Sequence, residues 1–143
     1  MQYRRAKLGG ATYFITANLA DRGTKTLIDH IDEFRTALKR VKANHPFHID
    51  AMVVLPDHFH LLMTLPPEDA NFSMRIGLIK ATFSRMLPKR ESIRASRATK
   101  RERGIWQRRF WEHLIRDDRD YAHHVEYIHI NPVKHGYVQR AAD

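Results

Sequence analysis

The sequence of 143 residues contains no cysteine, so neither a disulfide bond nor a thiolate metal site can form. It also has no apolar run approaching the roughly 20 residues that a membrane-spanning helix needs. The first 14 residues carry positive charge but lack the long apolar stretch of a secretory signal peptide. These absences predict a soluble, cytoplasmic protein with no membrane partner. The length fits a single domain, residues 1–143.

Acidic residues are scarce in one part of the chain, between Arg75 and Arg116. This segment has 13 lysine and arginine residues against 3 aspartate and glutamate residues. Aromatic residues are interleaved with the charge, namely Phe83, Trp106, Phe110 and Trp111. Basic side chains neutralise phosphates and aromatic rings stack on bases. The combination favours single-stranded nucleic acid as a partner over a plain solvated basic surface.

Hydrophobic periodicity predicts the order strand, helix, strand, strand, helix, strand, helix. The expected strands are residues 11–20, 47–55, 58–65 and 104–116, and the expected helices are residues 29–44, 73–87 and 118–130. Asp29, Ser73 and Asp117 are the candidate N-caps. This order predicts an α+β fold, a ferredoxin-like antiparallel sheet with helices on one face. Residues 89–103 are polar and basic, and we expect them to form a mobile loop.

The stretch PDHFHLLM, residues 56–63, begins the third expected strand. Residues i and i+2 of a strand point to the same face, so His58 and His60 lie side by side while Phe59 points to the opposite face. Such a pair can bind one divalent cation, or it can be two exposed histidines on a half-solvated strand. The pair alone does not decide between these two readings.

The last expected helix offers residues that could complete a site. Tyr127 and Asn131 are four residues apart and share one helix face. Tyr121 belongs to an apolar stripe and is expected to pack in the core, whereas Tyr127 is expected to point away from it. Asn131 precedes a proline and is expected at the C-terminal end of the helix. His123 and His124 lie one turn before Tyr127, and either is a candidate base.

Two imidazoles and one amide oxygen form a small uncharged ligand set that leaves coordination positions open. This set suits Mg²⁺ or Mn²⁺ held together with a phosphate, although a zinc site is an alternative. Tyr127 could then attack phosphorus and form a covalent phosphotyrosine. Because a free phenol has a pKa near ~10, the attack would need activation by the metal, the phosphate or a base.

Five segments together resemble a known family. LPDHFH, residues 55–60, is similar to the LPDH-hydrophobe-H signature of the one-tyrosine HUH transposases. The wider pattern resembles the REP-associated tyrosine transposases within that family. It consists of GGATYFIT, HPFHIDAMVVLPDHFHLLMTLP, IKATFSR, GIWQRRFWEH and HVEYIHINPVKHG. These segments cover nearly the whole chain. Related proteins often continue into a tail that contains tryptophan and serine, whereas this sequence ends at Asp143, so the resemblance does not extend to tail-dependent DNA recognition or autoregulation.

The resemblance implies a fold of the HUH endonuclease type that nicks single-stranded DNA with Mg²⁺ or Mn²⁺. Members leave a 5′-phosphotyrosine and a free 3′-OH, and they act on hairpins of repetitive extragenic palindromes (REP). Carried over by position, the HUH histidines are His58 and His60, and the nucleophile is Tyr127. Asn131 stands where related transposases have a glutamine metal ligand. The resemblance favours a monomer, although dimers occur among the relatives, and it implies a bacterial, nucleoid-associated protein.

The basic segment then supplies candidate DNA contacts, which are Arg75, Lys80, Arg85, Trp106, Arg108 and Arg109. At least one of the two tryptophans is expected to be in the core. Two alternatives to a nickase remain. One is a hairpin-binding module without catalysis, and the other is a phosphodiesterase in which a metal activates water instead of Tyr127.

Overall fold

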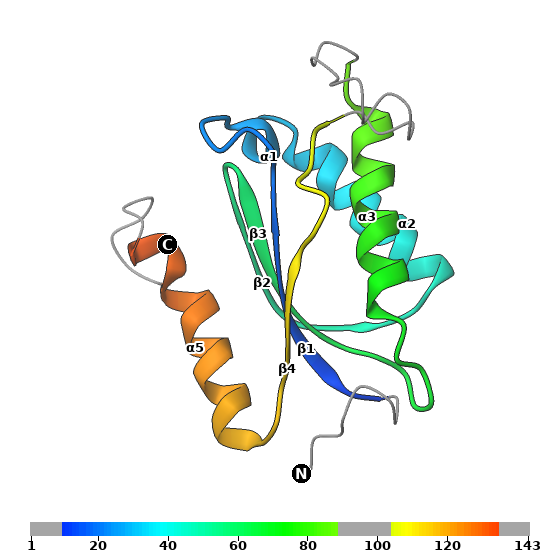
Figure 1. Cartoon of the computed structure of the whole chain (residues 1–143), viewed down its shortest axis with the longest axis vertical. Helices are drawn as coiled ribbons and strands as arrows, with labels where there is room; N and C mark the ends of the chain where they lie inside the picture. The colour runs from blue at the N-terminus through cyan, green and yellow to red at the C-terminus, as the bar shows by residue number, and fades with distance from the viewer. Residues whose placement is uncertain (1–9, 89–103, 135–143) are drawn as a thin grey trace.

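The structure is a computed structural model that describes residues 10–88 and 104–134 (Figure 1). Its strands are β1 (Thr12–Asn18), β2 (His48–Leu55), β3 (His58–Thr64) and β4 (Trp111–Leu114), and its helices are α1 (Thr26–Asp29), α2 (Ile31–Asn44), α3 (Phe72–Met86) and α5 (Asp118–Lys134). The strands form one sheet in the order β2-β3-β1-β4, with every neighbouring pair antiparallel. The predicted α+β, ferredoxin-like fold is therefore confirmed. The basic segment 89–103, expected to be a mobile loop, lies outside the described residues.

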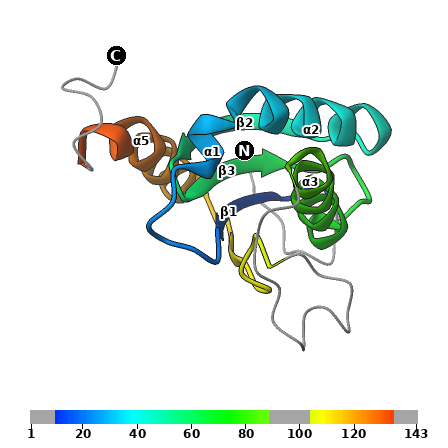
Figure 2. The same cartoon turned by 90° about the horizontal axis from the view of Figure 1, so that it is seen from above.

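Two apolar clusters lie on opposite faces of this sheet. Alternate residues of β1 and β3, such as Ile15 and Leu61, join the larger cluster beneath α2 and α3. The residues that alternate with them along each strand, such as Phe14 and Leu62, point to the other face and pack with Ile128 of α5. Figures 1 and 2 show α2 and α3 on one side of the sheet and α5 on the other. The expectation of helices on one face therefore holds for α2 and α3, whereas α5 covers the second face.

Two of the three expected N-caps differ in the structure. Asp29 does not cap α2, because it closes the separate short helix α1. The cap of α3 is Asn71 instead of Ser73, and its side-chain oxygen accepts a hydrogen bond from the Met74 amide at 3.1 Å. Asp117 does cap the last helix, since its carboxylate accepts from the Asp120 amide at 2.8 Å. Asparagine and serine are nearly equal as N-caps, so the sequence could not distinguish Asn71 from Ser73.

Two further boundaries also moved. The helix α5 runs to Lys134 and so passes through the proline that was expected to end it. The loss of one backbone hydrogen bond at Pro132 is tolerated because the buried residues Ile128 and Asn131 hold that side of the helix against the protein. The expected strand 104–116 is reduced to the four residues of β4, preceded by a single bridge between Leu19 and Trp106. No helix within residues 10–88 and 104–134 is long and apolar enough to cross a membrane.

The guanidinium of Arg75 joins α3 to two loops and is only 2% exposed. It donates to both carboxylate oxygens of Asp69, at 2.8 and 3.1 Å. It also donates to the backbone carbonyls of His45, Pro46 and Asn71. The prediction that Arg75 contacts DNA is therefore wrong for this structure, because its donors already bond within the protein. These contacts also hold the pKa of Asp69 below its usual value, chiefly through the hydrogen bond from Arg75.

We expect Arg75→Ala to destabilise the protein by about 2–4 kcal/mol, because it leaves three carbonyls and a carboxylate without their donor. Urea unfolding followed by circular dichroism measures this free energy. Arg85→Ala is the matched control, since Arg85 lies on the same helix but is exposed, and it should change stability by less than about 0.5 kcal/mol. Equal effects of the two variants would contradict the structural role of Arg75.

Candidate functional site

The two histidines lie on β3, one of the two central strands of the sheet. Phe59 between them is fully buried in the larger cluster, so His58 and His60 project together from the opposite face as predicted. They are only 9% and 5% exposed. They are not the half-solvated pair that the sequence left open, because α5 covers their face of the sheet.

Each of the two imidazole rings has a hydrogen-bond partner at Nδ1. Asp57 lies 2.7 Å from Nδ1 of His58, and the Thr16 hydroxyl lies 2.8 Å from Nδ1 of His60. Thr16 is the direct cross-strand neighbour of His60 on β1, so the sheet register itself sets this contact. With Nδ1 engaged in both rings, a metal ion would be bound through Nε2.

Asp57 is itself held in place by a cation. Arg22 donates from Nε to the Asp57 carboxylate at 2.8 Å. Burial alone would raise the pKa of Asp57, but the hydrogen bonds from Arg22 and His58 lower it below its ordinary value. The carboxylate therefore stays charged at neutral pH and keeps the proton of His58 on Nδ1.

A partly buried polar contact docks α5 on the sheet. The Tyr121 hydroxyl donates to the Asp50 carboxylate at 2.8 Å, and the Thr64 hydroxyl donates to the other carboxylate oxygen at 2.7 Å. The pairing of β2 with β3 shifts between Ile49 and Ala51, so Asp50 lies at a bulge. A bulge re-aims the side chain at that point of a strand. The residue at this bulge is Asp50, which accepts the hydrogen bond from Tyr121 of α5.

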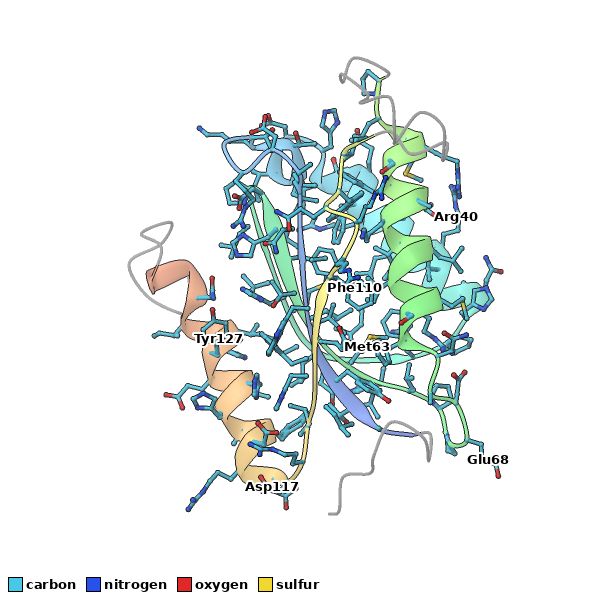
Figure 3. All side chains as sticks on the ribbon, in the orientation of Figure 1. Arg40, Met63, Glu68, Phe110, Asp117 and Tyr127 are labelled. Atoms are coloured by element: carbon cyan, nitrogen blue, oxygen red, sulfur yellow. The ribbon has the colours of Figure 1, made fainter. Side chains whose placement is uncertain are left out.

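Tyr127 lies over the histidine face of the sheet in the same chain (Figure 3). Its ring centroid is 5.3 Å from that of His60 and 5.9 Å from that of Phe14. The expectation that Tyr127 points away from the core is wrong, since it packs with Tyr121 against the smaller cluster. Tyr127, His60 and Thr16 line one open pocket of about 420 Å³, whose other lining residues are Phe14, Trp111, His123 and His124.

Asn131 is fully buried, and its side-chain oxygen and nitrogen have no hydrogen-bond partner among the described residues. It lies in the last turn of α5, near the C-terminal end of the helix as expected. An unsatisfied buried amide is costly, so a native protein that keeps one calls for an explanation such as an absent ion.

The position of Asn131 along the sheet follows from two contacts. Tyr121 bonds Asp50, which also bonds Thr64, the last residue of β3. Tyr127 packs on His60, four residues earlier in β3, so α5 runs antiparallel to β3. The four residues from Tyr127 to Asn131 advance the helix by about 6 Å, which is close to the spacing of about 6.6 Å between residues i and i+2 of a strand. We infer that Asn131 lies at the level of His58.

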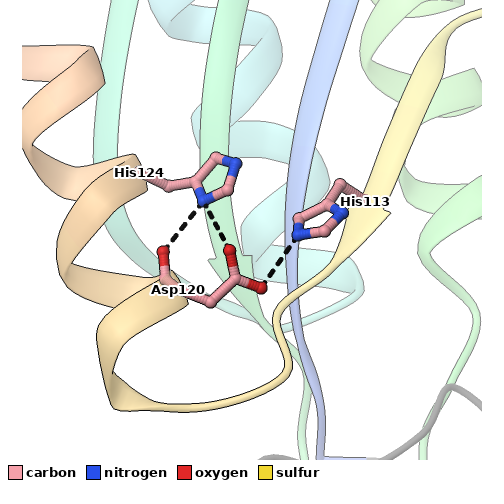
Figure 4. A group of neighbouring side chains, drawn as sticks. All are labelled: His113, Asp120 and His124. Carbon is pink, nitrogen blue, oxygen red and sulfur yellow. Dashed lines mark hydrogen bonds and ion pairs between the residues drawn. The ribbon is translucent and has the colours of Figure 1, made fainter.

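A second group of polar residues at the pocket was missed by sequence reasoning. His113, Asp120 and His124 come from β4 and α5, and their nearest ligand atoms all lie within 4.8 Å of one another. Figure 4 shows Asp120 between the two rings, 2.8 Å from Nε2 of His113 and 3.1 Å from Nδ1 of His124. The group has a composition that could bind a metal ion. Its atoms also satisfy one another without one.

The same carboxylate distinguishes the two candidate bases. His124 is half-buried, and its Nδ1 also lies 2.9 Å from the backbone oxygen of Asp120, whereas His123 is exposed. Burial by itself would raise the pKa of Asp120, but hydrogen bonds from the Arg116 amide and His113 lower it. Only His124 is thus oriented by a charged partner. The short spacing from Asp120 to His124 is the one signal in the sequence that could have revealed this pair.

The remaining candidate DNA contacts differ in exposure and in the face of the sheet on which they lie. Trp106 is only 6% exposed and donates from Nε1 to the Lys80 carbonyl at 3.1 Å, so its assignment as a DNA contact is wrong. Lys80 donates to the Gln107 carbonyl at 2.9 Å. Arg85 is exposed but lies on α3, on the face opposite the histidines. Arg108 and Arg109 are exposed in the segment that leads into β4.

Residues 19–131 match the family of IS200-like transposases. A Haemophilus influenzae protein assigned to the REP-associated tyrosine transposases is 51% identical over 99% of this chain and 81% of its own length. The REP-associated tyrosine transposase of Escherichia coli K12 is 43% identical over 99% of this chain and 78% of its own. A solved structure of a REP-associated tyrosine transposase bound to a REP hairpin superposes with a TM-score of 0.81, at 43% identity, over all of this chain and 79% of that one.

We expect Asn131→Leu to stabilise the metal-free protein by about 1–2 kcal/mol, because it replaces an unsatisfied buried amide with an apolar side chain of the same branching. Unfolding by urea in the presence of a chelator measures the change. Asn44→Leu is the control, since Asn44 is exposed and bonds the Arg40 carbonyl on α2. A loss of stability in Asn131→Leu would show that the amide has partners in the folded protein.

Proposed function

Because the chain belongs to the IS200-like transposase family, we propose that it is a metal-dependent single-stranded DNA nickase and strand transferase. Its substrate in this proposal is a REP-type hairpin, and its nucleophile is Tyr127. The observation that carries the proposal is the packing of Tyr127 against His60 within one chain. The buried Asn131 amide one turn farther along the helix supports it.

We propose His58, His60 and Asn131 as the ligands of one divalent cation, Mg²⁺ or Mn²⁺. Asp57 and Thr16 orient the two rings, and the amide of Asn131 would gain the partner that it otherwise lacks. An asparagine side chain is one bond shorter than the glutamine of related transposases, and the full burial of Asn131 within the helix suits that shorter reach. When bound, the cation would supply positive charge to polarise the scissile phosphate.

In the cleavage step, the phenol oxygen of Tyr127 forms a bond to phosphorus as the bond from phosphorus to the 3′ oxygen breaks. The phenol proton passes to a base, and the departing 3′ oxygen takes up a proton. The products are a 5′-phosphotyrosine and a free 3′-OH, so the phosphodiester energy is retained for rejoining. His60 and Phe14 pack on the tyrosine ring and restrict its direction of approach.

We assign the base to His124 in preference to His123. Asp120 engages Nδ1 of His124, so the proton would be accepted at Nε2, as in other carboxylate–imidazole pairs. Both histidines line the pocket with Tyr127, but only His124 has the carboxylate behind it.

A monomer is sufficient for this chemistry. The helix that carries Tyr127 folds onto the sheet of its own chain, so one chain supplies the nucleophile and all three proposed metal ligands. A dimer remains compatible with the same site. Action on hairpins in chromosomal DNA would take place in the bacterial cytoplasm, at the nucleoid.

We expect His124→Ala to slow cleavage by about 10²–10⁴-fold, because the side chain that would accept the phenol proton is gone. His123→Ala, the matched control on the neighbouring position, should retain most of the activity. Single-turnover cleavage rates measure both. A larger defect in His123→Ala would reverse the assignment.

We expect the wild-type protein with Mn²⁺ to form a covalent adduct with a labelled REP-type hairpin, and we expect Tyr127→Phe to form none. A denaturing gel separates the adduct from free DNA. Tyr13→Phe is the control, because the Tyr13 hydroxyl is buried on the other face of the sheet without a hydrogen-bond partner in the described structure, so its loss should leave activity unchanged.

The same gel tests the metal and the two alternative functions. Chelation should abolish the adduct, and adding Mg²⁺, Mn²⁺ or Zn²⁺ back separately identifies the active ion. Salt-sensitive hairpin binding without any scission would identify a binding module instead. Full cleavage by Tyr127→Phe would identify a phosphodiesterase that uses water.

A further inference from the structure

Trp111 is an exposed aromatic ring at the edge of the candidate site. Its side chain is 55% exposed, whereas the other tryptophan of the chain, Trp106, is buried. Trp111 begins β4 and lines the same pocket as Tyr127 and His60. A large exposed indole costs solvation free energy, so its place beside a pocket indicates a ligand.

The sheet register fixes where this ring lies relative to the proposed chemistry. Trp111 pairs with Thr16 on β1, and Thr16 pairs with His60 on β3, so the three residues form one row across the sheet. Neighbouring strands are about 4.8 Å apart, which places the backbone at Trp111 about 10 Å from that at His60. One or two nucleotides of single-stranded DNA span such a distance.

A column of rings supports Trp111 from one side. Its ring is parallel to that of His113, with an interplanar angle of 6° and centroids 6.0 Å apart. His113 in turn stacks on His124 at 4.9 Å, and the edge contact of Trp111 with Phe14 adds a second support. Asp120 bonds both histidines, so its carboxylate holds the column together (Figure 4). A ring held in this way can accept a flat partner with little loss of side-chain entropy.

The charges nearby favour a nucleobase as that partner. Arg109 is exposed two residues before Trp111 and can neutralise a backbone phosphate. Glu112 is also exposed, but as the next residue of the strand it points to the opposite face. An aromatic platform flanked by cations is how proteins hold unpaired bases.

We propose that Trp111 stacks on one unpaired base next to the phosphate that Tyr127 attacks, and that this contact sets the position of the cut. The proposal rests on the proposed function. It also gives the His113–Asp120–His124 group a role that requires no second metal ion, namely the support of this ring.

The test measures binding in the presence of a chelator, so that cleavage does not contribute. The probes are REP-type hairpins with single-stranded flanks in which one nucleotide at a time is abasic, and fluorescence anisotropy gives the Kd. The wild-type protein should lose roughly 5- to 100-fold in affinity at one or two flank positions. Trp111→Ala should bind intact DNA with that same loss and be insensitive to the abasic site at those positions, and Trp111→Phe should recover most of the affinity.

Ile28→Ala controls for the removal of an exposed apolar side chain elsewhere, and it should bind like the wild type. A Trp111→Ala variant that binds intact DNA normally, or that loses affinity equally on every abasic probe, would overturn the proposal. The outcomes are separable from those for the nickase. An abasic profile that depends on Trp111 without any covalent adduct would refute Tyr127 as nucleophile, whereas an adduct with a flat profile would refute only the role of Trp111.

Discussion

The hydrogen bond from Tyr121 to Asp50 determines where the last helix lies, and the candidate site depends on that placement. The bond is partly buried between helix and sheet, and Tyr121 also packs against the cluster that contains Phe14, Leu62 and Ile128. Because Tyr127 follows on the same helix, its position against His60 is a consequence of this docking. The helix converts a sheet face that would otherwise carry two solvated imidazoles into a partly closed pocket.

Around the histidines, preorganisation comes from ordinary sheet geometry and two short hydrogen bonds. Thr16 reaches His60 because the two are paired across neighbouring strands, and Asp57 reaches His58 because it is the preceding residue of the hairpin. Both supports engage the same nitrogen of their rings. Both supports fix the direction of their rings, and Asp57 also fixes the tautomer of His58, so the pair can bind a cation with little reorganisation.

Much of this arrangement could be predicted because it depends on local periodicity. The alternation of His58, Phe59 and His60 defined the two faces of β3, and the four-residue spacing placed Tyr127 and Asn131 on one side of a helix. What sequence could not show was set by tertiary contacts. The sequence predicted Arg75 to be a surface cation, but in the fold it bonds two loops and is buried. Likewise, only the packing of the core determines that Trp106 is buried while Trp111 is exposed.

The same limit explains the missed group at the pocket. His113 and Asp120 are seven residues apart on different elements, and their contact requires the turn from β4 into α5. Local rules also failed at Asn131, where the following proline predicted a helix end. The buried face of α5 outweighed the lost backbone hydrogen bond, and this kept the amide inside the protein instead of at a solvent-exposed cap.

The unequal size of the two apolar clusters has a consequence for how the molecule opens. Four buried residues fasten α5 to its face, whereas the opposite face is held by a cluster several times larger. The free energy needed to detach α5 is therefore smaller than that of global unfolding, and its amide hydrogens should exchange with solvent sooner than those of β3. A DNA strand joined to this helix would move with it when the helix detaches, while the sheet that holds the two histidines stays folded.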